Sequence, residues 1–200
     1  MKKPELLVTP HSVEHLEQLI EAGADAFVIG EQKFGLRLAG EFTIADVEQS
    51  VKIAHAAGKK VYVSVNALFH NERLDDLYAY MKEMERIGPD ALLFGDPAVV
   101  MAVRELNITV PLHWSPETIA TNWFQVNYWA ERGAKRTVLA RELSMEEVTE
   151  IKEHANAEIE VQVHGMTCMF QSKRSLLGNY FLYRDQAMEK KKRKENKNMF

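Results

Sequence analysis

The sequence predicts an α/β protein built as a (β/α)8 barrel, of which seven strand–helix units are visible. Short apolar segments alternate with longer amphipathic segments, which is typical of a parallel sheet covered by helices. Three turns that precede apolar runs share a glycine and a following small or cyclic residue, at 22–30 (AGADAFVIG), 87–95 (IGPDALLFG) and 132–140 (RGAKRTVLA). No Gly-x-Gly-x-x-Gly follows the first apolar run, which favours a barrel over a dinucleotide-binding sheet.

The first half of the chain predicts three strands, each followed by a helix. A strand at 5–9 precedes a helix at 11–22, with Ser12 as its cap and Gly23 after its end. A strand at 25–30 leads through a longer loop at 31–42 to a helix at 43–57, which Gly58 closes. The third strand is expected at 60–66 and the third helix at 71–87.

The second half continues the same alternation with four more strands. We expect strands at 90–94, 110–114, 136–140 and 158–163, almost entirely apolar where they are buried in a parallel sheet. Between them lie helices at 97–106, 122–132 and 144–155. Asp96 and Pro97 form a good helix start, and Ser144 with Glu147 matches a capping box.

The number of predicted strands stops at seven. A barrel normally needs about 250 residues, whereas the sequence has 200 and its end is highly charged. We therefore expect a barrel that is incomplete, completed by a partner, or filled unusually at the eighth position. Residues 1–182 are assigned to the barrel domain, and residues 183–200 to a charged basic tail or the start of an insertion.

Composition places the chain among ordinary globular proteins, with 46% hydrophobic and 27% charged residues. No segment has the continuous apolar length of a membrane span or a signal peptide, so a cytoplasmic protein without membrane contact is expected. The formal net charge is −4, yet residues 190–194 are five consecutive cations. Such a run is either a solvated surface segment or a contact to phosphates.

Each predicted strand ends in polar or glycine residues, with a proline among them in two places. In a barrel these positions face the active site. They are Thr9, Pro10, His11, Gly30, Glu31, Asn66, Gly95, Asp96, Pro97, His113, Ser115, Glu117, Arg141, Glu142, His164, Gly165 and Cys168. Asn66 equally fits an Asx turn, and Asp96 a helix cap. Arg37 fits either a surface cation or an anion-binding group, and His113 and His164 fit acid–base groups, metal ligands or core histidines.

The stretch that ends the last predicted strand resembles the signature region of peptidase family U32, the collagenase-like peptidases. The family pattern reads roughly E-x-F-x-H-G, two residues, C, and a Ser-rich run that ends near L-L-S. The corresponding positions here are Glu160, Val161, Gln162, Val163, His164, Gly165, Cys168, Ser172, Leu176 and Leu177. Three further segments resemble the family at Arg37, Ala39 and Phe42, at Ser115, Glu117 and Asn122, and at Arg141, Glu142, Leu143 and Ser144.

The resemblance also implies a cofactor that this sequence does not match. Many family members carry a second cysteine seven positions after the first and two more downstream, a set suited to an iron–sulfur cluster. Here Ser175 occupies that second position, and Cys168 is the single cysteine. The chain alone is therefore not expected to hold a cluster, and a second family subunit or a homo-oligomer is a partner to consider.

Three functions follow from these observations. The family resemblance implies a role in hydroxylating the wobble uridine of transfer RNA, with a prephenate-like dicarboxylate as a related ligand; this is the preferred hypothesis. Arg37, Arg141 and Arg174 would grip phosphate or carboxylate, and Phe34, Trp114, Trp123 and Phe170 would stack bases. The alternatives are a peptidase, for which Cys168 and His164 are the thiol–imidazole pair, and a non-catalytic subunit of a cysteine-complete relative.

The candidate site residues divide into two sets. The expected catalytic residues are His164, Cys168, Glu142 and His113. The expected substrate-binding residues are Arg37, Asn66, Asp96, Ser115, Glu117, Arg141 and Arg174.

Overall fold

The computed structural model describes residues 3–116, 120–165, 177–178, 180–186 and 188. The chain divides into two compact units, residues 1–162 and residues 163–200. The described residues of the second unit are helical at 177–178, 180–186 and 188. The division predicted after residue 182 falls inside this second unit and stays a prediction.

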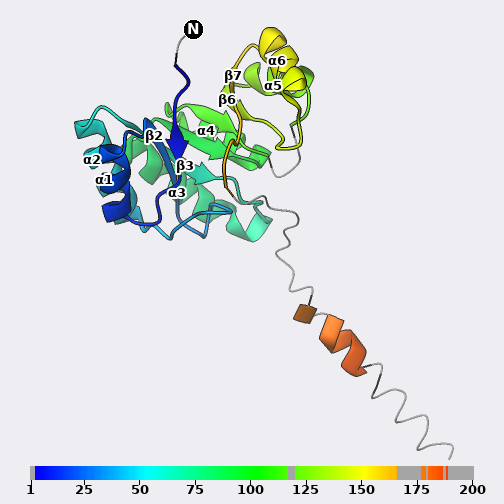
Figure 1. Ribbon diagram of the computed structural model, residues 1–200. Helices are drawn as coiled ribbons and strands as arrows, with labels where there is room; N and C mark the ends of the chain where they lie inside the picture. Colours follow the sequence, from blue (N-terminus) through cyan, green and yellow to red (C-terminus); the bar gives the residue numbers. More distant parts are fainter. Residues whose placement is uncertain (1–2, 117–119, 166–176, 179, 187, 189–200) are drawn as a thin grey trace, which may run out of the picture. The chain divides into compact units, whose positions relative to one another are not determined.

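The first unit is a seven-stranded parallel sheet whose strands follow sequence order, as predicted, and which curls into a half-barrel (Figure 1). Its strands are β1 (Leu7–Val8), β2 (Ala26–Ile29), β3 (Lys60–Val65), β4 (Ala91–Phe94), β5 (Leu112–Trp114), β6 (Ala134–Val138) and β7 (Glu158–Glu160). Within the described residues β1 and β7 are the two edges of this sheet.

Helices cover the outer face of the sheet and alternate with the strands. They are α1 (Val13–Glu21), α2 (Ile44–Ala56), the 3-10 turn η1 (Asn71–Arg73), α3 (Leu74–Ile87), α4 (Pro97–Leu106), α5 (Trp123–Ala130) and α6 (Met145–His154). Consecutive helices contact each other from α1 to α4, and α5 contacts α6. In Figure 1, α1, α2 and α3 lie beside one another on the helical side of β2 and β3.

Side chains of the strands alternate between two cores, because successive residues of a strand point to opposite faces. Val61 and Val63 of β3 belong to the large core between sheet and helices. Tyr62 and Leu93 belong to a small cluster on the opposite, inner face. This alternation identifies the residues of each strand whose side chains point into the half-barrel. These residues are the ones that can contribute to a site there.

Helix ends follow the predicted capping chemistry. The Ser12 hydroxyl oxygen accepts a hydrogen bond from the His15 N–H, and Ser144 forms the expected capping box with Glu147. Thr43 forms a second capping box, at the start of α2. Gly88 ends α3 with φ at 71°, a left-handed conformation that glycine adopts without steric cost.

The sixth strand starts two residues earlier than predicted. Gly133 reverses the chain directly before Ala134, and the register between β5 and β6 shifts between Leu112 and His113. Leu112 pairs with Ala134, whereas His113 pairs with Arg136. Arg136 is therefore an internal residue of β6 and not its first one, which places its side chain inside the protein.

None of the helices among the described residues is long and apolar enough to cross a lipid bilayer.

Candidate functional site

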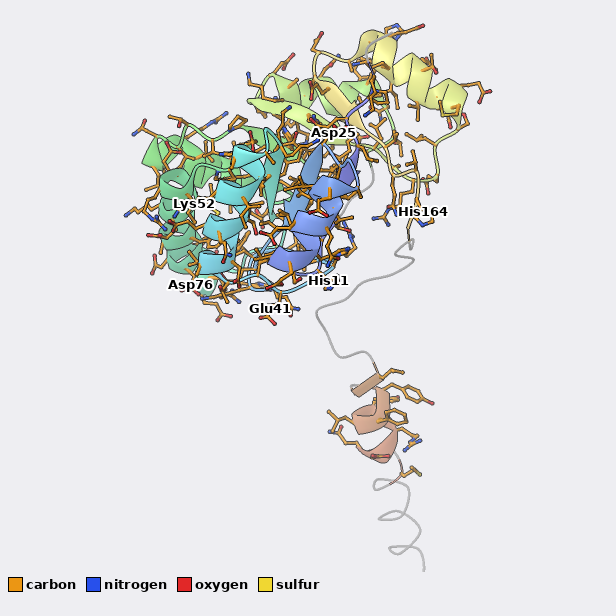
Figure 2. All side chains as sticks on the ribbon, turned by 60° about the vertical axis from the view of Figure 1, so that its left-hand side comes forward. His11, Asp25, Glu41, Lys52, Asp76 and His164 are labelled. Carbon is orange, nitrogen blue, oxygen red and sulfur yellow. The ribbon has the colours of Figure 1, made fainter. Side chains whose placement is uncertain are left out.

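The loops at the carboxyl-terminal end of the sheet contact one another and form a rim, and hydrogen bonds connect several of them. A Cβ at Gly40 would collide with the backbone of His11, so glycine lets the 31–42 loop pass the end of β1. The Ala67 N–H donates to the Phe34 carbonyl at 3.0 Å, and the Ala140 N–H donates to the Ala120 carbonyl at 2.9 Å. Figure 2 shows His11 and Glu41 together at this end of the first unit, with Asp25 at the other.

Three small residues form a row at the inner edge of this rim. Val65 pairs with Phe94 and Phe94 pairs with Trp114, so the residues after them, Asn66, Gly95 and Ser115, stand side by side. A Cβ at Gly95 would lie 3.1 Å from the Asn66 carbonyl oxygen and 3.3 Å from that of Ser115. The row brings together two predicted substrate-binding residues, Asn66 and Ser115.

The Asn66 amide is held in one orientation. Its Oδ1 accepts a hydrogen bond from the Leu36 N–H at 2.7 Å and another from the Ser64 hydroxyl at 2.8 Å. The Leu36 N–H can only donate and therefore pairs with an oxygen, which distinguishes Oδ1 from Nδ2. The Asn66 side chain thus connects the 31–42 loop to the end of β3 through Oδ1, and its Nδ2 group takes no part in these two bonds.

Asp96 has a structural role, because both of its carboxylate oxygens accept hydrogen bonds from backbone N–H groups. Its Oδ1 accepts from the Ala98 N–H at 2.9 Å, which caps α4 as the sequence predicted, with Pro97 in the first turn. Its Oδ2 accepts from the Phe69 N–H at 2.9 Å and fixes the loop after β3. Both carboxylate oxygens therefore have backbone partners, and Asp96 shapes the rim through them.

Arginines stand on the loops after β2 and β6. Arg37 is exposed and adopts φ of 56°, one of two left-handed non-glycine residues within the described part of the chain. Strained backbone of this kind concentrates at functional sites. Arg141 and Glu142 are exposed in the turn after β6, directly after the residue that bonds to the β5 loop. The rim thus carries a guanidinium on each of two loops.

The structure corrects the expected rim position of His113. His113 lies within β5 and is 5% exposed, because side chains alternate and Ser115 occupies the rim position. Its ring meets Tyr62 edge-on, with centroids 4.8 Å apart. The hydrogen-bonding atom Nδ1 is buried without a partner among the described residues. His113 consequently belongs to the interior and not to the rim.

An ion cluster that the sequence analysis missed fills the interior next to His113. The Arg136 guanidinium bonds Glu5 at 2.8 Å and Glu158 at 2.6 Å, and lies 3.7 Å from Glu160. The Tyr62 hydroxyl donates to Glu5 at 2.8 Å. Since Glu5 precedes β1 and Glu158 belongs to β7, Arg136 connects the two edge regions of the open sheet across its interior.

The pKa values in this cluster follow burial and charge. Burial, and after it the charge of the nearby Arg136, lower the pKa of His113 to about 4. Burial raises the pKa of Glu160 despite the attraction of Arg136. Burial also acts to raise the pKa of Glu5, but hydrogen bonds from Arg136, Tyr62 and Lys60 outweigh it, so that pKa is lowered. The interior thus favours a neutral His113 beside an ionised Glu5.

One sequence signal could have revealed the cluster. Glu158 and Glu160 flank Ile159, and this alternation of charged and apolar residues in a strand indicates one polar face. In a half-barrel whose outer face is covered by helices, that polar face has to be the inner one. Arg136 gave no comparable signal, because its position depends on the register shift between two strands.

Several predicted site residues cannot be joined to the rim. Glu117, Cys168 and Arg174 lie outside the described residues. His164 is described and exposed but belongs to the second unit. Within the described part of the chain, no group of three His, Cys, Asp or Glu side chains could hold a metal ion. The family's four-cysteine iron–sulfur cluster does not fit this chain alone, because Cys168 is its single cysteine.

Comparisons with known proteins identify the family of the chain. The model of the family described as peptidase family U32 matches residues 11–190. The tRNA hydroxylation protein P2 of Bacillus subtilis is 57% identical over the whole chain, which covers 65% of that protein. The tRNA hydroxylation protein P of Escherichia coli is 40% identical over 92% of the chain, which covers 41% of that protein. The chain thus spans less than two thirds of either relative.

A solved structure shares the architecture. The U32 peptidase Mk0906 superposes with a TM-score of 0.68 at 18% identity, over 84% of this chain and 73% of that one. At this identity the likeness concerns the fold, and it supports the half-barrel topology.

Proposed function

The chain belongs to peptidase family U32, and from this membership and the rim geometry we propose that it acts in 5-hydroxylation of the wobble uridine of transfer RNA. Its role would be to bind the RNA at the carboxyl-terminal rim of the half-barrel. Relatives at 57% and 40% identity are named tRNA hydroxylation proteins, which supports an RNA substrate. Action in the cytoplasm, where transfer RNA is found, is part of the same proposal.

The observation that carries the proposal is the pair of rim arginines around a row of small polar residues. Arg37 and Arg141 stand on the loops after β2 and β6, and the row of Asn66, Gly95 and Ser115 lies on the strands between them. Guanidinium groups bind phosphate oxygens in a bidentate manner. A nucleotide whose base is turned out of its stack presents both a phosphate and a base edge, and the rim offers groups for each.

The same arginines suit a small dicarboxylate, since guanidinium pairs equally well with carboxylate. We propose a prephenate-like dicarboxylate as a second ligand of the rim. Glu142, next to Arg141, is a proposed acid–base residue of the rim. His164 and Cys168 stay predicted catalytic residues of the second unit. His113 is withdrawn from this set, because it lies buried in the interior.

The peptidase alternative is supported by the family's name and by the spacing of His164 and Cys168. Its proposed nucleophile lies outside the described residues. The relatives of highest identity among those compared carry names from RNA modification, and so the RNA role is the better supported one. A subunit role beside a cysteine-complete relative is compatible with RNA binding at the rim.

The proposal is tested by nucleoside mass spectrometry of transfer RNA from cells that lack the gene. We expect loss of 5-hydroxyuridine-type nucleosides, rescue by the wild-type gene, and rescue reduced by about tenfold or more with Arg141→Ala, given the strength of charge-assisted bonds to phosphate. Arg104→Ala is the matched control: Arg104 is exposed in the last turn of α4, at the opposite end of the sheet. An unchanged nucleoside profile in the deletion strain would contradict the proposal.

A further inference from the structure

We propose that Asn66 selects uracil against cytosine, by donating a hydrogen bond from Nδ2 to the O4 carbonyl of the ring. This inference rests on the proposed function, because it assumes that a pyrimidine base enters the rim. Uracil and cytosine have nearly the same shape, so a protein that modifies uridine has to distinguish them by hydrogen bonds. Asn66 has the position, the burial and the fixed orientation for that task.

The side chain of Asn66 points into the half-barrel. Its Oδ1 accepts from the Ser64 hydroxyl, and residues two apart in a strand share a face. Tyr62, two residues before Ser64, belongs to the inner cluster, which identifies that face as the inner one. Gly95 stands next to Asn66 and contributes no side chain that would separate its amide from the space above the row.

The Asn66 amide is a fixed donor. The Leu36 N–H and the Ser64 hydroxyl both occupy Oδ1, at 2.7 Å and 2.8 Å. Exchanging the amide oxygen and nitrogen would set the N–H of Leu36 against an N–H2 group, so this exchange is disfavoured. Nδ2 therefore offers two N–H donors and no acceptor towards a ligand.

This donor has no hydrogen-bond partner in the described structure. Asn66 is 4% exposed, and within the described part of the chain its Nδ2 has no hydrogen-bond partner. Nδ2 is not among the buried side-chain atoms that lack a partner, so it is accessible to a ligand carbonyl, to which it can donate a hydrogen bond. The Ser115 hydroxyl lies two strands along the same row and can either donate or accept. The row can thus pair with a carbonyl beside a ring N–H.

The chemistry of the two pyrimidines decides the selectivity. At position 4 uracil has a carbonyl oxygen, an acceptor, whereas cytosine has an amino group, a donor. A fixed N–H2 group pairs with the first and opposes the second. Sites built to hydrogen-bond one polar group reject an analogue without it far more strongly than apolar pockets reject a difference in size.

The test exchanges the donor for an acceptor. In Asn66→Asp a carboxylate oxygen still accepts from the Leu36 N–H and the Ser64 hydroxyl, while the second oxygen replaces Nδ2. In the gene-deletion strain, we expect the full-length Asn66→Asp protein to restore at least about tenfold less hydroxylated uridine than wild type, as for the loss of one base-edge contact. Asn71→Asp, the same exchange at an exposed residue of η1, should restore the wild-type level.

A second measurement needs no variant. Uridine 5′-monophosphate should bind the purified full-length wild-type protein about tenfold more tightly than cytidine 5′-monophosphate. Equal binding of the two nucleotides, or full rescue by Asn66→Asp, would overturn the inference and leave the proposed function standing. Failure of the wild-type gene to restore hydroxylation would instead contradict the proposed function itself.

Discussion

At the residue scale, Arg136 has the most demanding environment in the described structure. Its side chain is 9% exposed and lies among Glu5, Glu158 and Glu160, with its guanidinium carbon 5.1 Å from the Tyr62 ring centre. A buried cation is tolerated only when its charge is paired and its N–H groups are bonded. Arg136 meets both conditions by bonding to residues near both edge strands of the sheet, Glu5 before β1 and Glu158 in β7.

Removing this cation should destabilise the folded protein. We expect Arg136→Met to lower the free energy of unfolding by about 3–5 kcal/mol, because the largely buried Glu5 and Glu160 lose their cationic partner. The matched control is Arg86→Met: Arg86 also bonds two glutamates, Glu48 and Glu83, but its side chain is 51% exposed. It should cost about 1 kcal/mol or less. Urea unfolding of both variants measures this difference. Equal losses in the free energy of unfolding would contradict a larger stabilising role for the interior cluster than for a surface ion pair.

His113 should make stability depend on pH. Its pKa is lowered to about 4 by burial and by Arg136, so the folded protein keeps it neutral while the unfolded chain protonates it near its usual value of 6.5. The stabilisation is therefore present above pH 6.5 and is lost as the pH falls towards 4, by up to about 3 kcal/mol. Tyr62, Arg136, Glu5, Glu158 and Lys60 surround the ring.

The measurement compares the urea midpoint of wild type and His113→Gln from pH 8 to pH 4. The wild-type protein should lose more stability than the variant across this range. Glu160 has a raised pKa, so its contribution is present at low pH and is lost as the pH rises through that pKa. This opposite trend occurs in both proteins and largely cancels in the difference. Parallel curves would contradict a neutral, buried His113.

At the element scale, the sequence predicted where strands and helices lie but not how neighbouring strands align. Glycine turns, capping residues and apolar runs are local signals, and α4 at Pro97–Leu106 has the predicted bounds. The predicted start of β6 was wrong by two residues. The true start depends on how β5 and β6 align, with the register shift between Leu112 and His113. The same pairing decides that Arg136 points inwards.

The loop at 31–42 shows the same division between local and long-range signals. Its length and its arginine were readable from the sequence. The position of the loop over the sheet was not readable, because it depends on the hydrogen bond between Leu36 and Asn66, which are thirty residues apart. Rim positions were predicted correctly where a strand end alone determined them, as for Asn66 and Ser115. His113 was wrongly placed because the alternation within a three-residue strand set it one position deeper.

At the scale of the whole molecule, the first unit is a half-barrel with the proposed RNA-binding rim at one end and an ion cluster inside. The cluster connects the regions of β1 and β7, which are the sheet's edges. Backbone hydrogen bonds and the side chains of Asn66 and Asp96 connect several rim loops to one another along the sheet. A fixed rim with exposed guanidinium groups suits the recognition of an RNA loop.

Photo-crosslinking tests the central claim, that RNA binds this rim, most directly. A transfer RNA with 4-thiouridine at the wobble position is irradiated with the full-length protein, and the crosslinked peptides are identified by mass spectrometry. We expect crosslinks in the rim loops, within residues 31–42, at 66–70 or near Arg141. Crosslinks confined to the opposite end of the sheet, around Asp25 or Arg104, would contradict the account.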